Sequence, residues 1–127
     1  MIMARIMVVD DEEKNRKLLK DFLEHKGHSV MTAEGGKEAL EKITEGPAIV
    51  LLDIMMPDMH GLKVLDEIKK VCPSAEVIMV TALDEHSVGM ECLKRGAFDY
   101  VTKPIDLKHL EELIDFKVTQ KSLNDEP

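Results

Sequence analysis

The stretch Ala48-Ile-Val-Leu-Leu-Asp-Ile-Met-Met-Pro-Asp-Met-His-Gly61 decides the fold of this chain. Five consecutive apolar residues, 48–52, lead directly to Asp53, and Pro57 and Gly61 then interrupt the chain. A short apolar run bounded by turn residues is typical of a strand that is buried on both faces of a parallel sheet. We therefore expect Asp53 at the carboxyl end of that strand, where open α/β sheets bind their ligands.

The rest of the sequence alternates in the same way. Apolar runs predict strands at 5–9, 28–33, 76–80 and 98–101. Apolar residues at helical spacing, with Gly and Pro as stop signals, predict helices at 14–26, 35–46, 62–72, 84–95 and 107–118. Asp84 and Asp106 are the expected caps of the last two helices, and the helix at 84–95 has the thinnest apolar face. Five strands alternating with five helices predict an α/β fold with a parallel sheet that is covered on both faces.

Length and composition restrict the protein further. A chain of 127 residues makes a single domain, here expected over 1–120, with a polar and frayed tail at 121–127. A net charge of -8 argues against direct nucleic-acid binding. No apolar run approaches a membrane span and the first residues lack a signal-peptide layout, so the expected location is cytoplasmic. Cys72 and Cys92 are expected to be small buried residues rather than a disulfide or metal ligands.

Polar residues follow the predicted strands at equivalent positions. Asp10 and Asp11 come after the first strand, Asp53 after the third, Thr81 after the fourth and Lys103 after the fifth. Because parallel strands deliver their carboxyl ends to one edge of the sheet, we expect these side chains to meet there. Two unit charges 4 Å apart repel by roughly 4 kcal/mol at an effective dielectric near 20, so the three carboxylates favour a bound cation.

These residue types suit phosphoryl chemistry. Carboxylate oxygens with room for water are typical ligands of Mg²⁺. A carboxylate can also act as a nucleophile toward phosphorus and form an aspartyl phosphate. Lys103 would supply a cation for the phosphoryl oxygens, and Thr81 would supply a hydroxyl donor.

The ordered set of these motifs resembles the receiver domain of two-component response regulators. The resemblance covers about residues 4–118, and its motifs are Asp10-Asp11, the Asp53 to Gly61 segment, Thr81-Ala82 and Tyr100-x-x-Lys103-Pro104. No single motif is decisive, but the ordered combination at these intervals is highly specific. It implies the flavodoxin-like strand order 2-1-3-4-5.

The resemblance also implies roles for individual residues. Asp53 would accept a phosphoryl group from a phosphohistidine on a sensor histidine kinase or phosphotransfer protein, so the chain would be a phosphoacceptor switch and not an enzyme in the usual sense. Mg²⁺ would be bound by Asp11, Asp53 and the backbone carbonyl of Met55, with Asp10 acting mostly through water. Thr81 and Tyr100 would form the switch pair. The surface of the fourth helix, fifth strand and fifth helix would then bind an output partner or a second copy of the chain.

Four positions depart from the family pattern or are unusual within it. Ile105 stands where an aromatic residue often follows Lys-Pro, and His60 precedes Gly61 where a small polar residue is commoner. Met55 and Leu83 lie two residues past Asp53 and Thr81, at positions that flank the path of the attacking water in this family. Both are apolar here, which predicts a long-lived phosphoryl group.

Two other functions fit the sequence less well than that of a receiver. An aspartate-nucleophile phosphohydrolase would require a second acid two residues after the nucleophile, where this chain has Met55. A flavin- or nucleotide-binding module would require a Gly-rich or Ser/Thr-rich loop after the first strand, where residues 10–13 are all acidic. No DNA-binding or catalytic segment follows the last predicted helix, so a stand-alone receiver and a piece of a longer protein both stay open.

Overall fold

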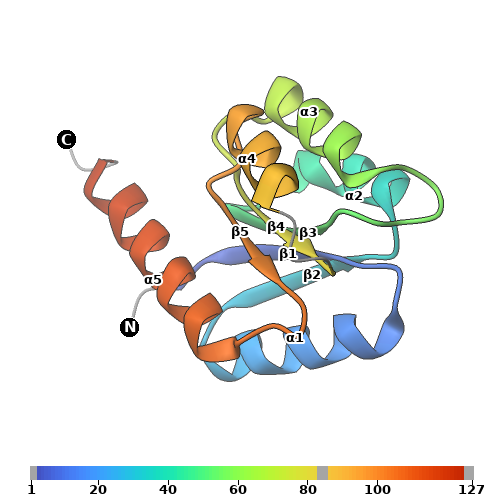
Figure 1. Ribbon diagram of the computed structural model, residues 1–127. Coiled ribbons are helices and arrows are strands. Elements are labelled where there is room, and N and C mark those ends of the chain that lie inside the picture. Colours follow the sequence, from blue (N-terminus) through green and yellow to red (C-terminus); the bar gives the residue numbers. More distant parts are fainter. Residues whose placement is uncertain (1–2, 83–85, 125–127) are drawn as a thin grey trace.

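The computed structural model describes residues 3–82 and 86–124, which form a single five-stranded sheet flanked by helices (Figure 1). All strands are parallel and lie in the order β2-β1-β3-β4-β5, which confirms the predicted α/β doubly wound architecture. The elements are, in chain order, β1 Arg5–Val9, α1 Glu13–His25, β2 Ser29–Ala33, α2 Gly36–Lys42, the 3-10 turn η1 Ile43–Glu45, β3 Ile49–Asp53, α3 Gly61–Val71, β4 Glu76–Thr81, α4 His86–Lys94, β5 Asp99–Thr102 and α5 Leu107–Asn124.

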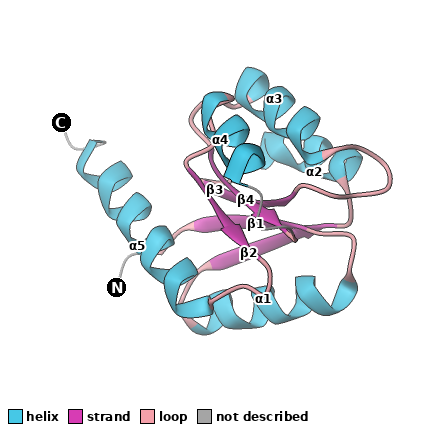
Figure 2. Ribbon diagram, viewed as in Figure 1, coloured by secondary structure: helices cyan, strands magenta, loops and turns pink. Residues whose placement is uncertain are grey.

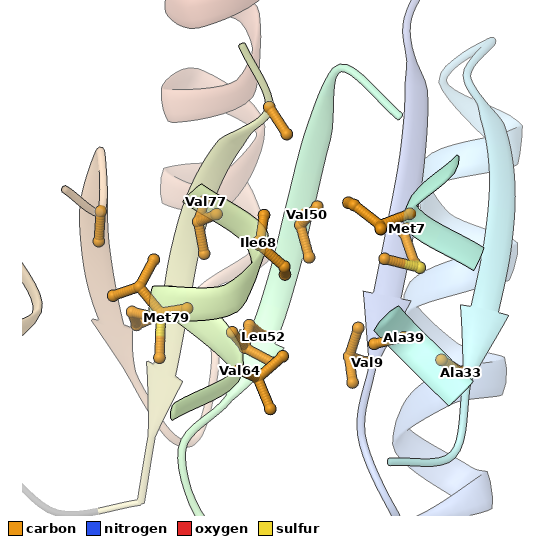
Figure 3. Close-up of a cluster of buried hydrophobic side chains, with 14 of the residues drawn as sticks. Met7, Val9, Ala33, Ala39, Val50, Leu52, Val64, Ile68, Val77 and Met79 are labelled. Atoms are coloured by element: carbon orange, nitrogen blue, oxygen red, sulfur yellow. The ribbon is translucent and has the colours of Figure 1, made fainter. Parts of the chain in front are cut away.

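The central strand β3 is apolar up to Asp53 because helices cover both of its faces. Helices α1 and α5 lie on one side of the sheet, and α2, α3 and α4 lie on the other (Figure 2). Successive strand residues point to opposite faces, so Val50 and Leu52 pack toward α2 and α3 while Leu51 packs toward α1 and α5. Figure 3 shows the core on the side of α2 and α3, where Leu52 of β3 lies beside Val64 of α3.

The helix boundaries follow from local chemistry. Asp106 caps α5 as expected, because its Oδ1 accepts hydrogen bonds from the Lys108 and His109 amides at 3.1 and 3.2 Å. His60 caps α3 in a similar way, with its Nδ1 accepting from the Leu62 amide at 3.2 Å. His60 is an exposed residue with a structural role, as the cap of α3, that the sequence did not reveal.

Several sequence expectations are wrong in detail. Helix α5 continues to Asn124, so residues 121–124 are helical and not frayed, and Lys121 Nζ donates to the Ser74 carbonyl at 2.5 Å. The helical spacing in 14–26 and 84–95 predicts that Leu18 and Leu93 face inward, but both are exposed, because the neighbouring Leu19 and Cys92 occupy those faces. The expected cap Asp84 lies outside the described residues.

The two cysteines differ in their surroundings. Cys92 is fully buried, as expected, whereas Cys72 is only partly buried, and both are free thiols. None of the described helices combines the length and the hydrophobicity that a bilayer span requires.

Candidate functional site

The carboxyl edge of the sheet collects the predicted polar residues. Asp10 directly follows β1, Asp53 ends β3, Thr81 ends β4 and Lys103 directly follows β5. The strands are in parallel register, and the Lys103 amide donates to the Thr81 carbonyl at 2.8 Å. Residues as far apart in the sequence as Asp10 and Lys103 therefore meet at one edge, as their equivalent positions after the strands predicted.

Asp53 is the centre of this site. Its side chain is nearly inaccessible, with the residue only 3% exposed, and Lys103 Nζ lies 2.9 Å from its Oδ2. The Met55 amide donates to its Oδ1 at 3.1 Å. Burial raises the pKa of Asp53 above its ordinary value, although Lys103 acts in the opposite direction. Burial also opposes the charge of Lys103, but the hydrogen bond and attraction from Asp53 outweigh it, so the pKa of Lys103 is raised.

The Asp10 carboxylate bonds to the start of α1 and also lies close to Lys103. Its Oδ1 accepts from the Glu12 amide at 2.9 Å, and its Oδ2 accepts from Asn15 Nδ2 at 3.3 Å. Lys103 Nζ lies 3.7 Å from the same Oδ2. Asp10 therefore orders the start of α1 and also contributes charge to the site. A role at the helix start and a role in the site do not exclude each other here.

Three carboxylates converge with oxygen atoms that all lie within 4.8 Å of one another. They belong to Asp10, Asp11 and Asp53. Asp11 is exposed whereas the other two are buried, so the cluster opens to solvent at Asp11. The donor set consists of hard oxygen atoms, which is the chemistry that Mg²⁺ prefers. The residues present thus fit the cation that the sequence predicts.

Thr81 and Tyr100 lie on the two strands beyond β3. Thr81 is buried at the end of β4. Tyr100 pairs with Met79 in the β4–β5 ladder, and its ring is partly buried against α4. The side chain of Leu83, which the sequence placed beside the site, lies outside the described residues.

Gly89 is one residue whose importance the sequence did not reveal. A Cβ atom at this position of α4 would lie only 2.2 Å from Tyr100 Cζ, so the ring occupies the space that a side chain would need. Gly89 lies in the middle of a helix, where glycine is less favourable than Ala. In the sequence, this unfavourable glycine was the one indication of close packing at this position.

Asp58 is the second missed residue. It lies in the loop between β3 and α3, and its two carboxylate oxygens accept from the Gly36 and Lys37 amides at the start of α2, each at 3.1 Å. The sequence contained one hint, because α2 begins at Gly35-Gly36 and has no capping side chain of its own.

Comparison with known proteins decides the family. The model of the response regulator receiver domain matches residues 6–115. This chain belongs to the response regulator receiver family. Receiver domains act in two-component systems, where they interact with histidine kinases or phosphotransfer proteins.

Individual relatives agree with this assignment. The receiver is 36% identical over 113 residues to the chemotaxis protein CheY of Thermotoga maritima, which covers 87% of this chain and 94% of that protein. A receiver domain protein (CheY-like) from Methanospirillum hungatei has a TM-score of 0.88 and 32% identity, covering 96% of this chain and 98% of the other. A chain of the CheX-CheY-BeF3-Mg+2 complex from Borrelia burgdorferi has a TM-score of 0.83 and 31% identity, covering 87% of this chain and 86% of that chain.

Many relatives are much longer. The receiver is 34% identical to the cyclic di-GMP phosphodiesterase of Thermotoga maritima over 94% of this chain, but it spans only 31% of that protein. It likewise spans 27% of the regulatory protein AtoC of Escherichia coli. The resemblance to these proteins therefore concerns their receiver portion.

Proposed function

We propose that this receiver is a phosphorylation-driven switch in which Asp53 accepts a phosphoryl group from a phosphohistidine of a sensor histidine kinase or phosphotransfer protein. The observation that supports it most is the buried Asp53 carboxylate beside Lys103 at 2.9 Å, with two further carboxylates close by. The switch changes only its own modification and releases no product from a separate substrate, so it is not an enzyme in the usual sense.

In the transfer, a carboxylate oxygen of Asp53 forms a bond to phosphorus. The bond between phosphorus and the donor imidazole breaks, and its electron pair returns to the imidazole nitrogen. Lys103 is already hydrogen-bonded to Oδ2 and can turn toward a phosphoryl oxygen as charge develops there. Thr81, at the end of the adjacent strand β4, can donate its hydroxyl to another phosphoryl oxygen.

Magnesium belongs to this proposal because the oxygen cluster fits it. Asp11, Asp53 and the backbone carbonyl of Met55 would hold the ion. Asp10 would act mostly through water, which agrees with its existing bonds to Glu12 and Asn15. When bound, Mg²⁺ would neutralise the carboxylates and take up charge on the phosphoryl oxygens.

The proposed output surface lies at the edge of the sheet that β5 forms. A phosphoryl group attracts Thr81 and Lys103, and the Tyr100 ring turns inward as Thr81 moves. Changing a 1:99 population to 99:1 takes about 5.5 kcal/mol, which a few charge-assisted contacts can supply. The surface formed by α4, β5 and α5 then binds an output partner or a second copy of the receiver.

The test uses a small phosphodonor. Incubation with acetyl phosphate and MgCl2 is expected to add the mass of one phosphoryl group at Asp53, located by peptide mass spectrometry, and Asp53→Asn is expected to add none. Release of free phosphate from many esters would instead indicate a phosphohydrolase. If neither phosphorylation of Asp53 nor release of free phosphate occurred, a flavin- or nucleotide-binding module would be favoured.

We also propose that the phosphoryl group is long-lived. Met55 is 64% exposed beside Asp53 and offers no hydrogen bond to orient an attacking water. The double variant Met55→Asn with Leu83→Glu is expected to hydrolyse faster, since it supplies polar groups at both flanking positions. The decay of the phosphorylated protein, followed by mass spectrometry, measures this, and an unchanged rate would contradict the proposal.

A further inference from the structure

The loop between β3 and α3, residues 54–60, includes Met55 and makes few hydrogen bonds to the rest of the protein, although Met56 and Met59 pack against the apolar core. At its start the Ile54 amide donates to the Val80 carbonyl at 3.0 Å, and at its end the Gly61 amide donates to the Ile54 carbonyl at 2.7 Å. Both contacts close the base of the loop. Neither one fixes the part beyond Pro57.

Asp58 joins that outer part to α2. Its Oδ1 and Oδ2 accept from the Gly36 and Lys37 amides, each at 3.1 Å. The approach is close, because a Cβ atom on Gly35 would lie 2.6 Å from Asp58 Oδ1. The bond from the Lys37 amide, followed by that from Gly36, holds the pKa of Asp58 below its ordinary value, so the carboxylate is charged. Within the described chain, no other side-chain hydrogen bond links this loop to a segment distant in sequence.

We propose that Asp58 is a positioning residue for the metal site, which fixes the loop on α2 and thereby holds the Met55 carbonyl where Mg²⁺ would bind. This inference rests on the proposed function. Without the two bonds the loop would sample more conformations, and ion binding would have to order it again at a cost in affinity.

The structure offers a matched control on the same helix. The Glu38 carboxylate accepts from the Glu34 amide just before α2, but it has no bond to the loop. Glu38→Ala therefore removes that hydrogen bond, the ion pair with Lys42 at 3.8 Å and one negative charge, and leaves the loop contact in place. Asp58→Asn removes the charge of Asp58 and keeps one oxygen acceptor.

The first measurement is calorimetric titration of each variant of the 127-residue chain with MgCl2. Asp58→Ala is expected to raise the dissociation constant about tenfold, the lower end of what loss of an outer partner costs a metal site. Asp58→Asn should regain much of this loss, and Glu38→Ala should bind as the wild type does. Equal affinities for Asp58→Ala and Glu38→Ala would overturn the inference, and so would an Asn variant as weak as the Ala variant, because the effect would then be one of charge.

The second measurement is the rate of phosphorylation by acetyl phosphate as a function of MgCl2 concentration. A positioning role predicts that Asp58→Ala needs more Mg²⁺ for half-maximal rate but reaches the wild-type rate at saturation. A lower rate at saturation would contradict it. Failure of the wild type itself to bind Mg²⁺ or to be phosphorylated would instead refute the proposed function, so the two failures can be told apart.

Discussion

At the scale of single residues, the protonation of Asp53 reflects a balance between burial and its ion pair. Burial raises its pKa, while the hydrogen bond and the charge of Lys103 lower it. The folded protein therefore holds a proton on Asp53 at pH values where the unfolded chain, with a carboxyl pKa near 3.8, has released it. Folded molecules then bind more protons than unfolded ones, so this group's contribution to stability falls as the pH rises.

Removing the amine shifts this balance. We expect Lys103→Met to raise the pKa of Asp53 further, because two influences that favour the carboxylate are lost while burial remains. The pH titration of the Asp53 side-chain carbon by nuclear magnetic resonance, without metal, measures the shift. A midpoint equal to or below that of the wild type would show that Lys103 does not stabilise the carboxylate.

Another buried ionisable residue, His28, lies at the edge of the sheet where the strands begin. His28 Nδ1 accepts from the Ala4 amide at 3.1 Å, which links the starts of β1 and β2. Burial lowers the pKa of His28 below 6.5, although Asp115 and Glu111 of α5 act in the opposite direction. Protonation of Nδ1 would remove the acceptor, so the folded state favours the neutral ring.

His28 makes the free energy of unfolding increase with pH. Between the folded pKa of His28 and its unfolded value of 6.5, the unfolded chain binds more protons, so this contribution to stability is lost as the pH falls. His28→Asn keeps an oxygen acceptor that does not titrate, and urea unfolding should show a smaller loss of stability between about pH 7.5 and pH 5.5. His28→Ala leaves the Ala4 amide without its partner and should cost about 1 to 3 kcal/mol even at neutral pH. Parallel pH profiles for the wild type and His28→Asn would contradict this account.

At the scale of elements, the position of Tyr100 depends on the surface of α4. The ring lies where a side chain on Gly89 would be, and Gly89 is buried beneath it. A glycine inside a helix costs up to about 1 kcal/mol of stability relative to Ala. Gly89 therefore weakens α4 but leaves the space that the Tyr100 ring occupies.

Gly89→Ala is therefore expected to move the Tyr100 ring away from α4, because its Cβ would lie 2.2 Å from Cζ. Tyr100 is the only tyrosine and the chain has no tryptophan, so intrinsic fluorescence reports on this ring alone. Acrylamide quenching should increase in Gly89→Ala and stay unchanged in Ser87→Ala, an exposed position of the same helix. Unchanged quenching in both variants would mean that the helix, and not the ring, had moved.

At the scale of the whole molecule, the carboxylates of the site destabilise the fold that the apolar cores stabilise. Two apolar cores on the faces of the sheet stabilise the fold, while the carboxylates at its edge repel one another. Any cation that binds this edge only in the folded state stabilises the entire domain by mass action.

We expect MgCl2 at about 100 times its dissociation constant to raise the free energy of unfolding by about 2.7 kcal/mol. Asp11→Ala should lose most of this gain, yet in EDTA it should be at least as stable as the wild type, because one repelling charge is gone. Urea unfolding with and without metal measures both effects. A variant that gained as much from Mg²⁺ as the wild type would exclude Asp11 from the ion site.

The fold and the membership of the edge site could be predicted from the sequence. Each strand is a short apolar run ended by a polar residue, and parallel strands bring those ends together whatever the distance between them along the chain. Asp10, Asp53, Thr81 and Lys103 thus meet as the sequence indicated. Most element boundaries differ from the expected ones by one or two residues, since the terminal turns of helices depend on caps and contacts.

Only the tertiary structure decided how the loop beside Met55 and the ring of Tyr100 are fixed. Asp58 caps a helix that precedes it by more than 20 residues, and Gly89 accommodates a ring from another element. Helix α5 also runs past its expected end at Val118 and contacts Ser74 through Lys121. None of these contacts belongs to a local repeat of period 2 or 3.6, so they appear only when distant segments have packed against each other.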